Sequence, residues 1–232
     1  MVWYQTTINP IYNPQGELQK FIIVDSDITQ IKEAETEILA QRNEIESQRD
    51  QIAKQNSEIT DSILYAERIQ KAVFPPTDYL SEILPEYFIL NKPRNIVSGD
   101  FYWASKNRNQ VLFAVADSTG HGVPGAFMSL LGITWLTTIT DTMSQFDPSK
   151  ILTRLRAEIM YTLHQRGEQG EANDGIEMAL CLIDFDKMKL TYAGANRPVY
   201  LVRNKTEIIK LNPAKMPLGI MYADEKTFFN ES

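Results

Sequence analysis

Two stretches decide the fold of this 232-residue chain: VSGDFYW at residues 97–103 and ADSTGHGVPGAF at residues 116–127. The apolar run VLFAVAD at residues 111–117 has the composition of a buried strand that ends in a carboxylate. Gly120 and Gly122 then mark a turn, and Pro124 suits the first turn of a helix. If the strands that carry these stretches pair as a hairpin, the carboxylates of Asp100 and Asp117 meet at one point.

Converging carboxylate oxygens are the ligands that hard divalent cations such as magnesium and manganese prefer. Gly99 permits a close approach of the backbone beside Asp100, and the glycines after Asp117 keep bulky side chains away. An aspartate at a strand end is also a common turn former or helix cap. The glycines favour the metal site over two structural turns, although the spacing alone does not require one.

The motifs VSGDFYW, ADSTGHGVPGAFMS, DGIEMALCLIDFD, YAGANRPVYLVR and KMPLGI together resemble the SpoIIE-type serine phosphatases, a branch of the metal-dependent PPM superfamily. The resemblance covers about residues 64–232. It implies an α+β fold: an antiparallel β-sandwich flanked by helices, with metals at one edge. It further implies that Asp100 and Asp117 hold two divalent cations, Mn²⁺ or Mg²⁺, and that the carbonyl of Ser118 is another ligand.

The implied reaction is attack of a metal-activated water on a phosphoserine or phosphothreonine of a regulatory protein, such as an anti-sigma factor antagonist. His121 is a candidate for positioning water or protonating the leaving oxygen, because its ordinary pKa lies near neutrality; the alternative is a hydrogen bond at the helix start. Arg94 is a candidate for binding the substrate phosphate, or else a solvated loop residue. Asp174 resembles a recurrent family aspartate and receives no role.

The N-terminal part predicts a sensory arrangement. Residues 1–29 read as two strands around the turn at residues 13–16 and resemble the last hairpin of a PAS domain. Residues 30–74 contain no proline or glycine and predict a long helix. Isoleucine recurs in strict steps of seven at positions 31, 38, 45, 52 and 59, with Gln41, Gln48 and Gln55 at the other core position.

The heptads predict a parallel coiled-coil homodimer through residues 31–62, in which the glutamine layers weaken the coil and let it relay a signal. A single amphipathic helix on its own domain is the alternative, but that role normally needs a wider apolar face. A sensor histidine kinase shares this layout, yet residues 30–74 contain no histidine to accept phosphate.

The predicted domains are residues 1–29, 30–74 and 75–232. In the last we expect strands at 87–90, 176–184, 189–193, 198–202 and 208–211, helices at 123–143 and 148–165, and a surface loop at 166–175. By the resemblance, a Ser-Asp-Gly motif and a late aspartate should follow Gly219. We therefore expect an incomplete phosphatase domain that binds metal weakly, and a dimeric signalling adaptor is the alternative function.

Composition adds three expectations. The net charge of −7 gives no electrostatic support for nucleic-acid binding. No apolar stretch approaches the roughly 20 residues that cross a bilayer. Cys181 lies in the apolar run MALCLI and predicts a core thiol in a reducing, cytoplasmic compartment.

Overall fold

The computed structural model describes residues 1–166, 173–221, 227–228 and 230–231. The chain divides into two compact units, Met1–Thr60 and Asp61–Ser232. In the first, strands β1 (Tyr4–Tyr12) and β2 (Leu18–Asp27) form an antiparallel hairpin. Gly16 takes a φ of 83° in the turn, and the Asn13 side chain accepts hydrogen bonds from the backbone N–H groups of Gln15 and Glu17. The predicted hairpin is present; its likeness to a PAS domain stays a prediction.

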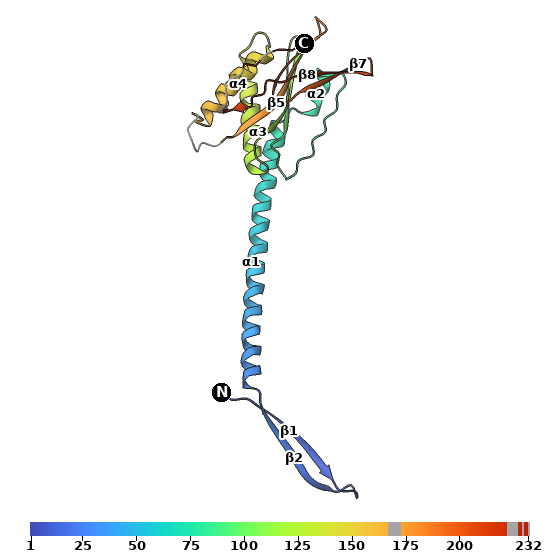
Figure 1. Ribbon diagram of the computed structural model, residues 1–232, viewed down its shortest axis with the longest axis vertical. Helices are drawn as coiled ribbons and strands as arrows, with labels where there is room; N and C mark the ends of the chain where they lie inside the picture. The colour runs from blue at the N-terminus through green and yellow to red at the C-terminus, as the bar shows by residue number, and fades with distance from the viewer. Residues whose placement is uncertain (167–172, 222–226, 229, 232) are drawn as a thin grey trace. The chain divides into compact units, whose positions relative to one another are not determined.

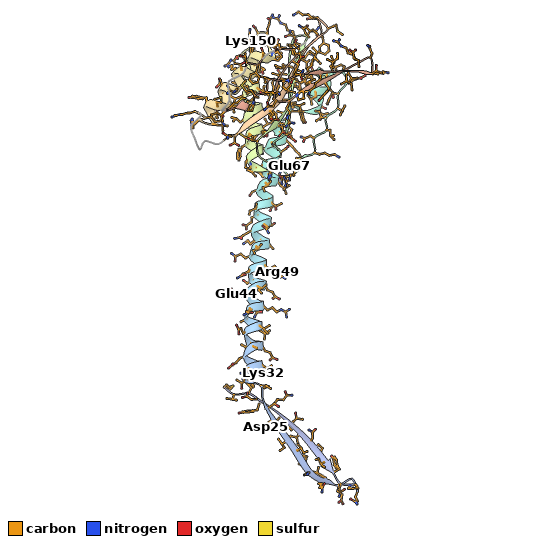
Figure 2. The ribbon with its side chains drawn as sticks, viewed as in Figure 1. Asp25, Lys32, Glu44, Arg49, Glu67 and Lys150 are labelled. Carbon is orange, nitrogen blue, oxygen red and sulfur yellow. The ribbon has the colours of Figure 1, made fainter. Side chains whose placement is uncertain are left out.

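Helix α1 (Thr29–Val73) runs for 45 residues and spans the boundary between the two units. The five heptad isoleucines, at positions 31, 38, 45, 52 and 59, are 56–64% exposed. Polar side chains such as Glu44 and Arg49 project from the same helix (Figure 2). The helix therefore presents a row of regularly spaced isoleucines that no other part of the described chain buries.

The second unit is built on an antiparallel sheet of five strands (Figure 1). Strands β3 (Phe101–Asn107), β4 (Gln110–Ser118), β5 (Gly175–Asp184) and β6 (Lys189–Ala195) follow one another in this order, and β9 (Leu218–Gly219) pairs with β5. A second, two-stranded sheet consists of β7 (Val199–Arg203) and β8 (Glu207–Leu211). The α+β fold with antiparallel sheets and a long N-terminal helix is confirmed.

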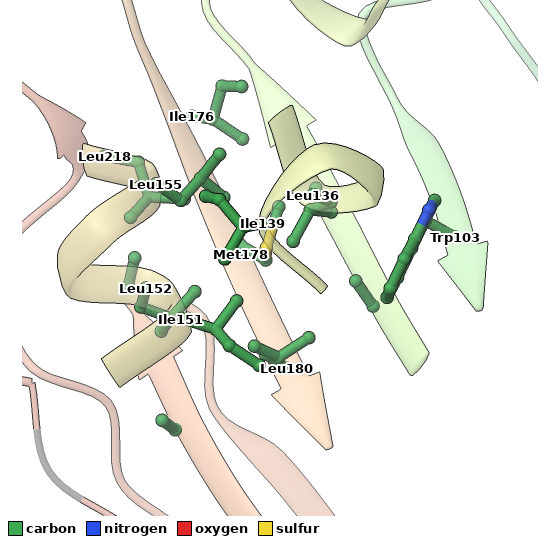
Figure 3. Close-up of a cluster of buried hydrophobic side chains, with 14 of the residues drawn as sticks. Trp103, Leu136, Ile139, Ile151, Leu152, Leu155, Ile176, Met178, Leu180 and Leu218 are labelled. Atoms are coloured by element: carbon green, nitrogen blue, oxygen red, sulfur yellow. The ribbon is translucent and has the colours of Figure 1, made fainter. Parts of the chain in front are cut away.

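One face of the larger sheet is covered by helices α3 (Val123–Asp141) and α4 (Pro148–Thr162). The core between this face and the helices contains Met178 and Leu180 of β5 (Figure 3). They pack with Leu136 and Ile139 of α3 and with Ile151, Leu152 and Leu155 of α4. Each of these side chains is fully buried, and burying such a side chain stabilises the fold by about 1.5–3 kcal/mol. This helical layer holds the sheet in place, and Asp100 and Asp117 lie at one end of its strands β3 and β4.

The other face carries α2 (Thr77–Ile83) over β3 and β4, and the β7–β8 hairpin over Cys181 and Tyr192. The strand expected at residues 87–90 is wrong: these residues form no strand, and Phe88 is 90% exposed. Part of the loop expected at 166–175 lies outside the described residues.

The expectation that no apolar stretch approaches the length of a membrane span is wrong: within the described ranges, helix α3 has that length and hydropathy. Half of this apolar segment is buried inside the protein, where residues of α3 form the core together with β5 and α4. The composition of α3 is thus explained by its position in the core of the second unit.

Candidate functional site

Asp100 directly precedes β3, and Asp117 is the second-last residue of β4, so both lie at the same end of these neighbouring strands. Phe101 pairs with Ala116, so the antiparallel register continues to Asp100 opposite Asp117. Residues directly opposite one another in such a pair have Cβ atoms about 5 Å apart. Phe101 and Ala116 point into the helix-covered core, and because side chains alternate along a strand, both aspartates point to the other face. The structure therefore brings the two carboxylates together.

The two carboxylates are close enough to affect one another. The pKa of the Asp100 carboxyl is raised above its ordinary value, first by burial, then by the negative charge of Asp117 and by a hydrogen bond shared with that side chain. The positive charge of Arg197 acts in the opposite direction. Two like charges held together in this way favour a cation between them.

Small residues make the cradle around this pair. A Cβ atom on Gly99 would lie 2.9 Å from the Ser118 hydroxyl and 3.2 Å from its carbonyl oxygen, and one on Gly125 would lie 2.7 Å from the Gly120 carbonyl oxygen. The Ser118 hydroxyl donates to the carbonyls of Gly99 and Gly125 at 2.9 and 3.2 Å. These hydrogen bonds hold together three segments that only glycine permits to approach so closely.

A cluster of charges missed by the sequence analysis adjoins the aspartates. Arg197 follows β6, and its guanidinium forms an ion pair with Asp117 and a second with Glu177, whose carboxylate lies 2.8 Å away. Glu177 lies opposite Asp117 in the register of β4 and β5. One feature of the sequence could have indicated this cluster: Glu177 is a charged residue near the start of the otherwise apolar strand β5.

Asp174 approaches the site through Thr119. The Thr119 hydroxyl donates to the Asp174 carboxylate at 3.0 Å and accepts from the Gly175 N–H at 3.1 Å. The backbone N–H of Thr119 in turn donates to the Gly175 carbonyl at 3.0 Å. These contacts attach the start of β5 to the residues that follow Asp117.

His121 and Arg94 lie in exposed loops. The Nδ1 atom of His121 is 3.2 Å from the Asn95 side-chain oxygen, which ties the glycine turn to the segment before Asp100. Gly120 and Gly122 on either side have positive φ angles of 86° and 66°. Among the described residues, no hydrogen bond or ion pair joins Arg94 to either aspartate.

Helix α1 reaches the segment before Asp100 through Gln70, which is 4% exposed. The Gln70 amide donates to the Ser98 carbonyl at 2.6 Å and to the Ser129 hydroxyl at 2.8 Å, and it accepts from the Ser98 N–H at 3.1 Å. The Ser98 hydroxyl accepts from the N–H of Asp100 at 3.0 Å. Two hydrogen-bonded steps thus connect α1 with the backbone of Asp100.

The carboxylates have the oxygen chemistry of a divalent cation site. Within the described part of the chain, no group of three or more His, Cys, Asp or Glu side chains is arranged to hold a metal. A hollow of about 940 Å³ adjoins Asp100, Asp117 and Arg197 and is otherwise lined mainly by apolar side chains such as Phe113 and Val115. Two protein carboxylates with an accessible approach are therefore the core of the site.

A family model described as stage II sporulation protein E (SpoIIE) matches residues 107–229, more than half of the chain. The chain belongs to the SpoIIE family. The resemblance to the SpoIIE-type phosphatases that the motifs indicated is thereby confirmed. No curated protein matches the chain.

Among solved structures, the SiaA-PP2C domain of Pseudomonas aeruginosa is 28% identical, with a TM-score of 0.66 over 76% of this chain and 67% of that one. The PP2C phosphatase domain of SpoIIE from Bacillus subtilis, solved with a fragment of its regulatory domain, is 21% identical, with a TM-score of 0.45 over 58% and 37% of the two chains. RsbX in complex with magnesium is 16% identical, with a TM-score of 0.45 over 62% and 64%. The chain thus spans about two thirds or less of these relatives.

Proposed function

We propose that this chain is a protein serine/threonine phosphatase whose Asp100 and Asp117 hold divalent cations, Mn²⁺ or Mg²⁺. One observation carries the proposal: a chain of the SpoIIE family holds two facing carboxylates, one with a raised pKa, at a glycine-lined sheet edge. A bound divalent cation supplies Lewis acidity and lowers the pKa of water. In this proposal the carbonyl of Ser118, the residue after Asp117, is a further oxygen ligand.

The other candidates act around this pair. His121, tied to Asn95 at the turn after Asp117, holds or donates a proton at the leaving seryl oxygen. Arg94, in the exposed loop before Asp100, receives the substrate phosphate through its planar set of N–H donors. The substrate is a phosphoserine or phosphothreonine of a regulatory protein, such as an anti-sigma factor antagonist. The cytoplasmic location expected from Cys181 belongs to the same proposal.

We also propose that the chain is a parallel homodimer through residues 31–62. Five isoleucines at seven-residue steps, each more than half exposed, form a seam that a second copy of α1 would bury. Gln41, Gln48 and Gln55 alternate with them and lower the stability of the coil, which suits a helix that transmits a signal from the N-terminal hairpin. Analytical ultracentrifugation tests this: the dimer should dissociate on Ile45→Lys substitution, and a monomeric wild type overturns it.

One observation favours a second candidate, a dimeric adaptor that binds a partner without catalysis: among the described residues, no group of three or more His, Cys, Asp or Glu side chains is arranged to hold a metal. Phosphate release from a phosphoserine peptide in the presence of Mn²⁺ separates the two functions. The enzyme predicts release that Asp117→Asn abolishes and that Asp141→Asn, an exposed aspartate at the end of α3, leaves unchanged. Equal release by wild type and Asp117→Asn dismisses the catalytic assignment.

A further inference from the structure

We infer that Arg197 is a resident counter-ion of the carboxylate site: its guanidinium occupies Asp117 until a divalent cation replaces it, and it thereby sets the affinity of the site for metal. This inference rests on the proposed function, because it assigns cation binding to Asp100 and Asp117. It adds a residue from the β6–β7 turn that competes with the metal for one of these carboxylates.

The contacts of Arg197 span two strands. Its guanidinium forms ion pairs with Asp117 on β4 and, at 2.8 Å, with Glu177 on β5. These two acidic residues face each other in the register of the sheet. A guanidinium presents five N–H donors in one plane and can therefore hold two carboxylates at once, which a lysine ammonium does less well.

The turn that carries Arg197 is held firmly in place. Asn196 takes a left-handed φ of 58°, and its side-chain amide donates to Glu177 at 3.1 Å. The hydroxyl of Tyr192, a fully buried residue, donates to the Arg197 carbonyl. The Asn196 N–H donates to the Ala214 carbonyl at 2.9 Å. These hydrogen bonds fix the backbone of Asn196 and Arg197, from which the guanidinium reaches both carboxylates.

The charges explain why an arginine lies here. Without a cation, Asp100 and Asp117 repel each other, and the guanidinium relieves part of that repulsion. A divalent cation at the pair repels the guanidinium and satisfies Asp117 in its place. Glu177 remains as the second partner of Arg197, so the exchange leaves no charged group without a partner.

The test measures Mn²⁺ binding by calorimetry, a readout independent of turnover. Arg197→Gln removes the competing charge and keeps a hydrogen-bonding side chain. Because Arg197 and Asp117 are 45% and 47% exposed, the pair has the strength of a surface ion pair, and the variant should bind Mn²⁺ up to about fivefold more tightly than wild type. Arg197→Lys, which keeps the charge but spans the two carboxylates poorly, should fall between them.

Arg203→Gln is the matched control, since it removes the same charge from an exposed position on β7. Binding by Arg197→Gln that is no tighter than that of Arg203→Gln overturns the inference and leaves the metal site standing. Weaker Mn²⁺ binding by Arg197→Gln and Arg197→Lys than by wild type, with unchanged circular dichroism spectra, also overturns the inference. That result would mean that Arg197 holds the carboxylates in position for the metal and does not compete with it. No Mn²⁺ binding by wild type or any variant overturns the proposed metal site and the inference together.

Discussion

Gln70→Leu tests the connection between α1 and the carboxylate site. In the wild type the Gln70 amide pairs with both backbone groups of Ser98 and donates to Ser129, and all three residues are buried. The substitution keeps the side-chain volume and the helix propensity but leaves the Ser98 N–H and carbonyl without their partner. A buried polar group deprived of its hydrogen bond costs about 1–3 kcal/mol. We expect the free energy of unfolding to fall by about 2–4 kcal/mol.

Urea unfolding followed by tryptophan fluorescence measures the loss, because Trp103 is buried beside α3 in the same unit. At this chain length the loss corresponds to a decrease in Tm of about 5–15 °C. Gln51→Leu, on the exposed part of α1, makes the same chemical change and should shift stability by less than about 0.5 kcal/mol. A Gln70→Leu protein as stable as the Gln51→Leu protein would refute the reasoning.

Three further predictions follow from single groups. Asp100→Asn should raise the free energy of unfolding of the metal-free protein at pH 7 by a few tenths of a kcal/mol, because a carboxyl with a raised pKa carries a charge that opposes folding. The same substitution should abolish the rise in Tm that Mn²⁺ causes in the wild type. Asp147→Ala should cost about 1 kcal/mol at pH 7, since Asp147 caps α4. Burial alone would raise the pKa of Asp147, but hydrogen bonds from Asn230 and Ser149 lower it, so urea titrations should show the deficit vanish as pH falls below that pKa. Burial raises the pKa of Cys181 to about 12, so the thiol should react with Ellman's reagent at pH 8 only after unfolding; rapid reaction of the folded protein would contradict its burial.

Local patterns in the sequence predicted most of the elements. The run at residues 111–117 is apolar, lacks breakers and ends in a glycine turn, and it forms β4 followed by α3, with Pro124 in the first turn of the helix. The pairing that brings Asp100 opposite Asp117 followed from the same short hairpin. These features depend on residues close in sequence, whose apolar pattern predicts local structure.

The failures concern partners distant in sequence. Residues 87–90 have the apolar composition of a strand, but no neighbouring strand pairs with them and they form no strand. The short helix α2, which begins directly after Pro76, was not expected because seven residues carry too little periodicity. Arg197 escaped notice because its contacts with Asp117 and Glu177 depend on the registers of β4 with β5 and of β5 with β6.

The central claim is that Asp100 and Asp117 together hold divalent cations. Crystals soaked with manganese chloride and measured at a wavelength where manganese scatters anomalously test it most directly. We expect an anomalous peak within about 2.5 Å of carboxylate oxygens from both residues, absent from Asp117→Asn crystals treated identically. Anomalous density elsewhere on the protein with none between these carboxylates would contradict the account.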